Sequence, residues 1–592
     1  MRTCTRHETA TGRAGGWGAK LAANIKSGNE LDSGNVPRNV ARDERHSGLA
    51  WAPLMSIAVA AFAVEIPFFF LGTPSGHDVE FHLYSWLEVL SQWKLGIVYP
   101  RWAALANFAY GEPRFIFYPP ASWALGAALS AIFPWTLAAS IYIWLALSAA
   151  GVCMFLLARQ WLDRRDAAFA AVLYAVNPYH LVIVYWRSAF AELLASSLLP
   201  LLLLLMLRAD EKGRRIIVYL ALLLASAWLI NAPAALMIHY SLALLMLLIA
   251  WQRRSARVLL VGTVAAVLGA ALAAVYLLPV IYEQKWITIA QAVSAGSRPQ
   301  DSFLFIHTTD ADHDAFNHLI SWIAVGEILL TVAAAWGARS WRRRNRTLWY
   351  SLVAWAAACS VLMLSITNAL WRILPKLQYM QFPWRWMLCL GIPFALLSVL
   401  GLRRWTVRVS FYLALLGVLA FGWHHFQPPW WDNAGDLREM QDNMATGEGY
   451  EGVDEYTPVG ADPSSVLKDA RRVVVDGPAH AAIHVSQWTP EFKLFTAEMS
   501  VPDNLALRLF NYPAWRVSVN GRQVQPGARE GTGQMLVPVE AGANQVQINF
   551  VRTWDRTAGG WISLLALILA FVLWKLPSSS GSAFALVATM KW

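Results

Sequence analysis

The sequence predicts an α-helical protein that crosses a membrane about 12 or 13 times and carries a β-sandwich domain before its final transmembrane helix. Hydrophobic residues make up 57% of the 592 residues, charged residues only 15%, and the mean hydropathy is +0.40. Apolar runs of bilayer-spanning length recur between residues 51 and 424. Residues 425–558 are polar with short alternating runs, and a last apolar run follows.

Basic residues between the apolar runs predict the orientation. Since cytoplasmic loops are enriched in Lys and Arg, we expect these clusters and both termini on the cytoplasmic side of the plasma (inner) membrane. The clusters lie at 159–165, 208–215, 253–257, 342–346 and 403–408, and the expected spans are 51–71, 137–158, 167–186, 193–207, 216–230, 232–251, 258–281, 319–339, 347–370, 384–402, 409–424 and 560–576. The net charge of +10 is explained by these orientation signals and implies no nucleic-acid partner.

The same patterns predict the domain boundaries. Residues 1–48 are polar, Gly-rich and basic, without the apolar stretch of a signal peptide, and predict a disordered cytoplasmic tail. Four further parts are expected: a transmembrane domain at 49–424 with a large first outer loop at 72–118, an extracytoplasmic β-rich domain at 425–558, a final transmembrane helix at 559–577 and a cytoplasmic tail at 578–592.

Two parts of the first outer region are expected to lie against the membrane. Residues 85–110 mix tryptophan and tyrosine with Lys94 and Arg101, a composition typical of a helix in the headgroup layer. Residues 118–133 are apolar, but a full crossing there would put the cluster at 159–165 outside. We expect 118–133 to be re-entrant or interfacial.

The domain at 425–558 shows strand signals. Residues 515–524 alternate around Asn520-Gly521, the pair that a two-residue type I′ hairpin turn favours. A second pair of runs, 535–539 and 545–551, flanks Gly542-Ala543-Asn544 and predicts a small antiparallel sandwich. No nucleophile–base pattern occurs in it, and such modules more often bind or brace than catalyse.

The first outer loop supplies the leading candidate for chemistry. It begins Gly76-His77-Asp78-Val79-Glu80-Phe81-His82, which places carboxylates beside imidazoles at the mouth of the bilayer. Such a carboxylate can take a proton from an acceptor hydroxyl or help to hold a cation, and we take Asp78 as the lead residue. The other interpretation is a hydrated loop whose charges keep it out of lipid.

Basic residues also lie on the outer face, against the usual charge bias. Arg385, in Gln381-Phe382-Pro383-Trp384-Arg385-Trp386, is expected in the first turn of a helix, where a guanidinium suits a phosphate. The alternative is an Arg that reaches toward lipid headgroups. The others are Arg187, Lys285, Arg298, Arg372 and Lys376.

A second acid, Glu192, is expected on the same side, so that Asp78 and Glu192 could share one cavity. Residues 310–314 begin with calcium-loop spacing, but Ala315 replaces the required Gly and Ser321 the required Glu, which excludes an EF-hand and leaves weak cation binding open. The four cysteines lie in the tail or in apolar spans and predict neither a disulfide framework nor a thiolate metal site.

Six short motifs carry a resemblance over most of residues 51–576. The chain resembles the bacterial membrane proteins labelled 6-pyruvoyl-tetrahydropterin synthase-related, and it is similar to YfhO-like proteins and GT-C glycosyltransferases; the label implies no pterin chemistry. Ser188 stands where the family's Arg-Gly-Ala pattern has Gly. The motifs are Gly76-His77-Asp78 with His82, Phe117-Tyr118-Pro119-Pro120, Asn177-Pro178-Tyr179, Arg187-Ser188-Ala189-Phe190-Ala191-Glu192, Gln381-Phe382-Pro383-Trp384-Arg385 and Tyr512-Pro513-Ala514-Trp515.

The GT-C resemblance implies an inverting glycosyltransferase with an acid of the first outer loop as base and a polyprenyl-phosphate sugar donor that enters from the bilayer. Asp78 matches that acid, and Glu192 matches a second acid that binds a cation or orients substrate. Metal dependence varies among such enzymes, so a divalent cation is left open and no metal ligand is assigned. The expected catalytic residues are Asp78, Glu192, His77 and Glu80, and the expected substrate-binding residues are His82, Arg187, Arg385, Lys376 and Lys285.

The expected function is therefore transfer of a sugar from a lipid-linked donor in the membrane to an envelope glycan, lipid or protein at the outer face. Two other classes remain open. A transporter or flippase for lipid-linked polysaccharide would be favoured by inverted repeats with paired broken spans, which the sequence does not show. A non-catalytic assembly factor predicts that Asp78 is dispensable.

Overall fold

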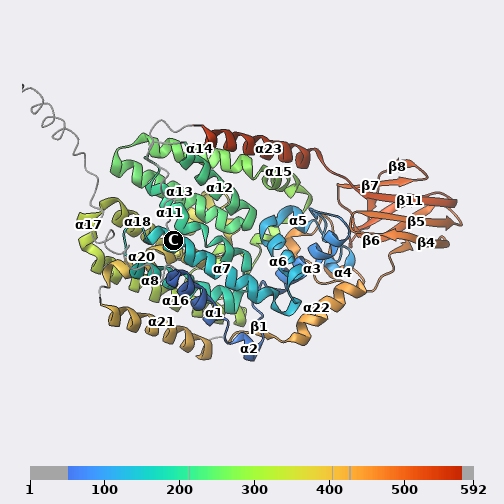
Figure 1. Ribbon diagram of the computed structural model, residues 1–592. Coiled ribbons are helices and arrows are strands. Elements are labelled where there is room, and N and C mark those ends of the chain that lie inside the picture. Colours follow the sequence, from blue (N-terminus) through green and yellow to red (C-terminus); the bar gives the residue numbers. More distant parts are fainter. Residues whose placement is uncertain (1–50, 212–213, 403, 426–427, 577–592) are drawn as a thin grey trace, which may run out of the picture. The chain divides into compact units, whose positions relative to one another are not determined.

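The computed structural model describes residues 51–211, 214–402, 404–425 and 428–576 (Figure 1). The tails expected at 1–48 and 578–592 lie outside these residues. Helices dominate up to residue 425, and most strands lie after residue 470.

Within the described residues, nine helical segments are long and apolar enough to cross a membrane, or up to eleven if each of two bent pairs counts as one span. The predicted helical membrane fold is confirmed. The nine segments are Ala52–Leu71 (α1 and α2), Trp135–Ala158 (α7), Arg164–Arg187 (α8, α9 and a π-helical turn), Phe190–Leu207 (α10 and α11), Ala232–Arg253 (α13), Ala311–Arg344 (α16 and α17), Pro383–Gly401 (ending in α20), Trp405–His425 (α21) and Trp554–Lys575 (α23).

The remaining apolar helices depart from simple spans. α14 (Ala256–Leu272) meets the helix that continues from α15 (Ala274–Glu283) at 75°, and α18 (Arg346–Leu362) meets the helical segment Ser365–Ile373 at 87°. The spans expected at 258–281 and 347–370 are therefore bent. α12 (Arg215–Ile230) and α6 (Pro120–Ile132) are shorter, and the 13 residues of α6 are fewer than the about 20 that a crossing needs.

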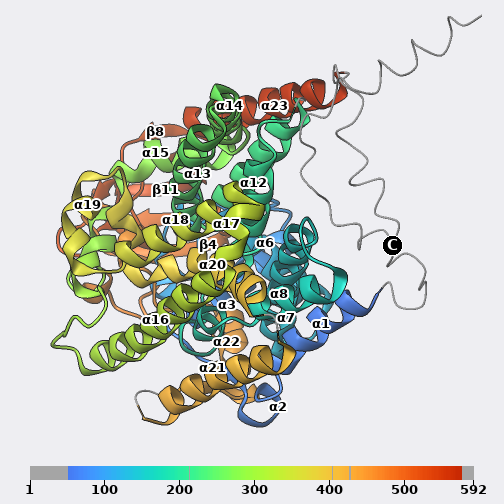
Figure 2. The same ribbon diagram turned by 90° about the vertical axis from the view of Figure 1, so that its left-hand side faces the viewer.

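The segments differ in the share of their residues that is buried inside the protein. Arg164–Arg187 and Pro383–Gly401 are 83% and 94% buried, so they form the centre of the bundle, whereas α21 and α23 are only 22% and 17% buried. Figures 1 and 2 both show α21 and α23 at opposite edges of the helices. The side chains that α21 and α23 expose are largely leucine, valine and aromatic residues, which suit lipid contact.

The first outer region is packed into the protein rather than laid along its surface. α3 (Val79–Lys94) covers only the first part of 85–110 and contacts α6, and the chain then runs irregularly to α4 (Ala106–Ala109) and α5 (Arg114–Phe117). Trp86 and Trp102 are fully buried, the former stacked on Tyr142. The expected headgroup-layer helix is therefore wrong, because these tryptophans are buried by protein instead of facing lipid.

After α21 the chain forms α22 (Ala434–Thr446), which packs against α3 and α7, and then two antiparallel sheets. The sheets share one apolar core, so the predicted sandwich is confirmed. The first sheet has the order β3 (Val473–Val475), β6 (Asp503–Phe510), β10 (Gln534–Val539), β9 (Gly527–Ala528), and the second the order β4 (Ala481–Trp488), β5 (Phe492–Met499), β11 (Gly542–Phe550), β7 (Trp515–Val519), β8 (Arg522–Val524).

Two sequence-predicted strand pairs have different outcomes. β7 and β8 form the predicted hairpin: Val519 pairs with Arg522, and the turn residues Asn520 and Gly521 both have positive φ, 49° and 76°, as a type I′ turn requires. β10 and β11 are strands as expected but lie in different sheets, so the turn between them connects the two layers.

A buried ion pair joins the sandwich to the helices. Glu283, at the end of α15, accepts two hydrogen bonds of 2.7 Å from the Arg556 guanidinium of α23 and one of 2.6 Å from the Tyr512 hydroxyl of the sandwich. Glu283 and Arg556 are almost completely buried. The charges satisfy each other at a point where three elements meet.

Candidate active site

The loop that carries Asp78 is held against the end of the Arg164–Arg187 segment. The backbone N–H of Asp78 donates to the Arg187 carbonyl at 2.9 Å, and that of Gly76 donates to Ser188 Oγ at 3.0 Å. A Cβ at position 76 would lie 2.5 Å from the Trp186 carbonyl oxygen. Only glycine therefore allows this approach, which places the Asp78 side chain beside Arg187.

The structure explains how Ser188 can occupy the position where the family's Arg-Gly-Ala pattern has Gly. It has φ +49° and ψ +32°, a left-handed conformation that favours glycine. Its hydroxyl donates to the Pro74 carbonyl at 2.9 Å and accepts from the Gly76 N–H, so the serine side chain ties the two loops together. These hydrogen bonds offset the cost of the left-handed backbone.

Five side chains from four segments meet here and are called the Arg187 cluster: Asp78, Tyr179, Arg187, Glu192 and Arg385. The Arg187 guanidinium donates to Glu192 Oε2 at 2.6 Å through one terminal nitrogen and reaches Asp78 Oδ2 at 3.5 Å through the other. Glu192 Oε2 also lies 3.3 Å from Arg385 Nε, and Glu192 Oε1 accepts from the Tyr179 hydroxyl at 2.6 Å. Sequence-distant Asp78, Glu192 and Arg385 are thus brought together around Arg187.

Exposure divides the cluster into a buried part and an accessible part. The side chains of Arg187 and Glu192 are 2% exposed and that of Arg385 is 8% exposed, whereas that of Asp78 is 40% exposed. Two guanidiniums face two carboxylates, so the formal charges cancel. Asp78 is therefore the ionisable member of the cluster that a ligand can reach most readily.

Aromatic rings cover the two guanidiniums. The Arg187 guanidinium lies 4.9 Å from the ring of Trp384, and that of Arg385 lies 4.8 Å from the ring of Phe382. Arg385 also donates to the Met380 carbonyl at 2.8 Å. These contacts hold both cations in place, since a buried charge is stable only when it is paired and hydrogen-bonded.

The other predicted residues of the first loop take different positions. His82 is buried, and burial lowers its pKa to about 4, so its imidazole is neutral near pH 7. His77 contacts the rings of Phe316 and Trp430. Partial burial raises the pKa of Glu80, and the carboxylates of Asp432 and Glu451 raise it further. Glu80 is exposed, and the charges that raise its pKa are those of Asp432 and Glu451 rather than members of the Arg187 cluster.

Lys285 and Lys376 are not brought to the Arg187 cluster. The ammonium of Lys285 lies 3.9 Å from the centre of the Tyr282 ring, and that of Lys376 lies 5.0 Å from the Tyr379 ring. Both side chains are exposed and, among the described residues, neither forms an ion pair. Their predicted position in outer loops did not indicate that they lie apart from the Arg187 cluster, because their distance from the cluster depends on how the helices pack.

Tyr179 and Trp384 both contact the charged side chains, although neither has a role predicted from the sequence. The available signal was their place in two of the motifs that carry the family resemblance, Asn177-Pro178-Tyr179 and Pro383-Trp384-Arg385. Asn177 caps α9 (Pro178–Val182) by accepting from the His180 N–H, which fixes the start of the helix that carries Tyr179.

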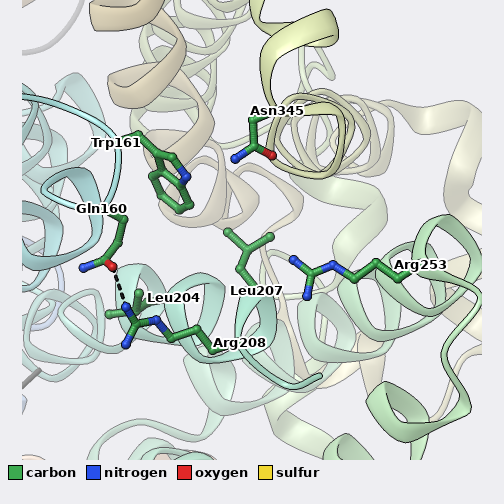
Figure 3. Close-up of a pocket in the computed structure, with 7 residues that line it drawn as sticks. All are labelled: Gln160, Trp161, Leu204, Leu207, Arg208, Arg253 and Asn345. Atoms are coloured by element: carbon green, nitrogen blue, oxygen red, sulfur yellow. Dashed lines mark hydrogen bonds between the residues drawn. The ribbon is translucent and has the colours of Figure 1, made fainter. Parts of the chain in front are cut away.

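A separate cavity of about 230 Å³ lies near the other end of the Arg164–Arg187 segment (Figure 3). Arg208 donates to Gln160 at 2.6 Å, and Arg253 points toward Leu207. Glu211 lies 3.8 Å from Arg208 and, with Asp210, also acts electrostatically on Arg253. The cavity includes none of the predicted site residues. Its lining is Gln160, Trp161, Leu204, Leu207, Arg208, Arg253 and Asn345.

Comparison with solved structures gives distant likenesses. An oligosaccharyltransferase from Archaeoglobus fulgidus in the apo form has a TM-score of 0.38 and 14% identity, over 69% of this chain and 57% of that one. AglB from the same organism, in complex with an inhibitory peptide and a dolichol-phosphate, has a TM-score of 0.36 and 14% identity, over 68% and 56%. ArnT from Cupriavidus metallidurans, bound to undecaprenyl phosphate, has a TM-score of 0.29 and 13% identity, over 73% and 93%.

The chain thus spans little more than half the length of the archaeal enzyme. None of the curated proteins matches the chain. A family model described as "6-pyruvoyl-tetrahydropterin synthase related domain; membrane protein" matches residues 115–427, which is more than half of the chain. The chain belongs to this family of 6-pyruvoyl-tetrahydropterin synthase related membrane proteins.

Proposed function

We propose that this protein is a membrane glycosyltransferase that transfers a sugar from a polyprenyl-phosphate-linked donor to an envelope glycan, lipid or protein acceptor at the outer face. The observation that carries the proposal is the Asp78 carboxylate, which is 40% exposed and held by a buried, charge-balanced cluster. A carboxylate fixed in this way at the mouth of a bilayer has the position and the chemistry of a general base.

In the proposed reaction, Asp78 accepts the proton of the acceptor hydroxyl, and the oxygen of that hydroxyl attacks the anomeric carbon of the donor sugar. The bond from that carbon to the phosphate oxygen breaks, and the electron pair leaves with the lipid phosphate, so the configuration inverts. Arg187 orients Asp78 through the 3.5 Å ion pair. The positive charges of Arg187 and Arg385 stabilise the charge that develops on the phosphate.

Glu192 is assigned a positioning role in this proposal. It binds Arg187 and Arg385 at once and accepts from Tyr179, so its two oxygens are engaged and it is almost completely buried. A base needs access to the proton that it abstracts, which favours Asp78 over Glu192. His82, buried and neutral near pH 7, is proposed to position the first loop by packing on Phe190 rather than to pair with a charged group of the substrate. Lys285 and Lys376 attract anionic lipid on the outer loops.

The Asp78→Asn variant tests the proposal. The amide preserves size but removes basicity, and loss of general-base catalysis lowers rates by about 10²- to 10⁴-fold. Transfer from a polyprenyl-linked sugar should be measured for purified wild type, Asp78→Asn and the control Asp442→Asn, whose side chain is exposed on α22. Asp442→Asn should keep full activity, and donor binding should survive in both variants.

A rate for Asp78→Asn close to that of wild type would contradict the assignment. In that case Glu80 is the remaining accessible acid of the loop, and Glu80→Gln would be measured next. No transfer by purified wild type, with transport of the lipid-linked glycan lost on deletion of the chain, would instead support the transporter or assembly-factor class.

A further inference from the structure

A second group of ionisable side chains lies at the start of α16, apart from the Arg187 cluster. His307 Nδ1 is 3.4 Å from Asp314 Oδ1, and His318 Nδ1 is 3.6 Å from Asp314 Oδ2. The two imidazole rings are 4.7 Å apart, and one potential ligand atom from each residue lies within 4.8 Å of the others. Two imidazoles and one carboxylate thus lie close together.

The local sequence explains why these three residues meet. Asp314 and His318 are four residues apart on α16 (Ala311–Gly337), so they share one face of the helix. Asp310 caps that helix by accepting from the His313 N–H at 2.8 Å. The Thr308 N–H donates to Asp314 Oδ1 at 2.9 Å, which fixes the preceding loop so that His307 lies over the same face.

This face is separate from the proposed reaction centre. Phe316, two residues from both Asp314 and His318, lies on the opposite side of the helix, where its ring contacts His77 at 5.2 Å and Trp384 at 5.5 Å. α16 therefore presents Phe316 to the Arg187 cluster and presents Asp314 and His318 away from it.

We propose that His307, Asp314 and His318 bind a divalent transition metal ion of the Zn²⁺ class. Zn²⁺ takes imidazole nitrogen and carboxylate oxygen at about 2.0–2.1 Å, so neighbouring ligand atoms of a tetrahedral site are about 3.3 Å apart. The Nδ1 atoms of His307 and His318 lie 3.4 and 3.6 Å from the two different carboxylate oxygens of Asp314, close to this spacing. The three potential ligand atoms lie within 4.8 Å of one another, so small side-chain rotations would bring them around one ion. Water completes the fourth position. Ca²⁺ is excluded as the preferred ion, because it takes six to eight oxygen ligands.

The metal has a structural role in this proposal. It joins the loop before α16 to the first turns of that helix, at a place where the loop is already bonded through Asn317, which donates to the Ile306 carbonyl at 2.6 Å. Fixing these turns also fixes Phe316 against His77 and Trp384. The ion takes no part in sugar transfer, and the site does not depend on the proposed glycosyltransferase activity.

Metal binding by the full-length protein, purified in detergent and stripped with a chelator, tests the proposal. Zn²⁺ binding should be measured by calorimetry, and the visible spectrum of added Co²⁺ should show a tetrahedral site with nitrogen and oxygen ligands. We expect one ion per chain in wild type and a loss of affinity of about 10- to 100-fold or more in His318→Ala and Asp314→Ala. Ca²⁺ should not compete.

Two control variants separate this site from others. His313→Ala removes a neighbouring imidazole that bonds Ser302 rather than the cluster, and Asp78→Asn alters the proposed reaction centre. Both should bind Zn²⁺ as wild type does. The proposal is overturned if wild type binds no Zn²⁺, or if His318→Ala and Asp314→Ala bind it as tightly as wild type. Equal loss in His313→Ala would show adventitious binding by surface histidines and would also overturn it.

Discussion

At the scale of single residues, Gly76 and Ser188 decide where Asp78 lies. Gly76 lets the first outer loop approach the Trp186 carbonyl, and Ser188 spans the gap with two hydrogen bonds. The resulting ion pair between Asp78 and Arg187 is long, 3.5 Å, so a small movement of the loop would break it. The backbone around residue 76 is therefore as important for the proposed chemistry as the carboxylate itself.

This contact predicts the effect of Gly76→Ala. The new Cβ would lie 2.5 Å from a backbone oxygen, so the loop must move and Asp78 must lose its contact with Arg187. We expect transfer activity to fall by about 10²-fold, as misplacement of a catalytic group by about 1 Å can do. Gly326→Ala is the matched control, because a Cβ there meets no atom within 4 Å. Equal activity in the two variants would disprove the role of the close approach.

His82 predicts a pH dependence of stability. Its pKa is about 4 in the folded protein, against about 6.5 when unfolded, so the unfolded chain binds more protons between these values. Stability is fully present above pH 6.5 and is lost as the pH falls toward 4, by about 3 kcal/mol in total. Thermal unfolding in detergent should show this slope in wild type and in His480→Gln, whose side chain is exposed. The slope should be absent in His82→Gln. If that variant keeps the slope, His82 is not the cause of the pH dependence.

At the scale of elements, the helices and the basic clusters together predict how the protein is oriented in the membrane. α7 is followed by the cluster at 159–165, and α17 (Trp341–Arg344) continues from α16. We therefore predict that the Arg187 cluster and the sandwich lie on the side of the membrane opposite to both basic clusters.

Cysteine labelling with an impermeant reagent measures this orientation. In intact cells, a cysteine at Arg344 should stay unlabelled, whereas one at Arg516, exposed on β7, should react. Permeabilised cells should label both, which controls for reactivity. All four native cysteines are replaced by alanine in the background chain: Cys4 and the cysteines at 153, 359 and 389, which lie within helices. Rapid labelling at position 344 in intact cells would show that the predicted topology is inverted.

At the scale of the whole molecule, the ion pair of Glu283 and Arg556 joins α15 to α23, and the Tyr512 hydroxyl bonds the sandwich to the same carboxylate. Removal of one partner of a buried pair leaves an uncompensated charge, which costs about 3–5 kcal/mol. A pair at the surface contributes little, typically below about 1 kcal/mol. This chain contains both kinds of ion pair. The surface pair is that of Arg298 and Asp301, which lie 2.8 Å apart and in which Arg298 is 43% exposed.

We therefore expect Glu283→Gln to lower the thermal midpoint and to increase proteolysis between the helices and the sandwich. Asp301→Asn should change either property little. Both variants keep the side-chain size, so the comparison isolates burial of the charge. Similar midpoints for the two variants would show that the Glu283 pair does not hold the sandwich in place.

Composition and local pattern were sufficient for the fold class of this protein. Hydropathy predicted the membrane helices, because the requirement for about 20 apolar residues acts on each segment independently of the others. Asn520-Gly521 predicted its hairpin, because a type I′ turn needs two adjacent residues that tolerate positive φ. Such properties depend on residues that are neighbours in the chain.

Only the tertiary structure decided which side chains meet. It joined Asp78, Glu192 and Arg385 through Arg187, left Lys285 and Lys376 elsewhere, and buried Trp86 and Trp102. It also put β10 and β11 in different sheets and brought His307 over Asp314 and His318. These outcomes depend on which helices and sheets pack together, and packing is determined by contacts between segments far apart in the sequence, where no local periodicity identifies the partner.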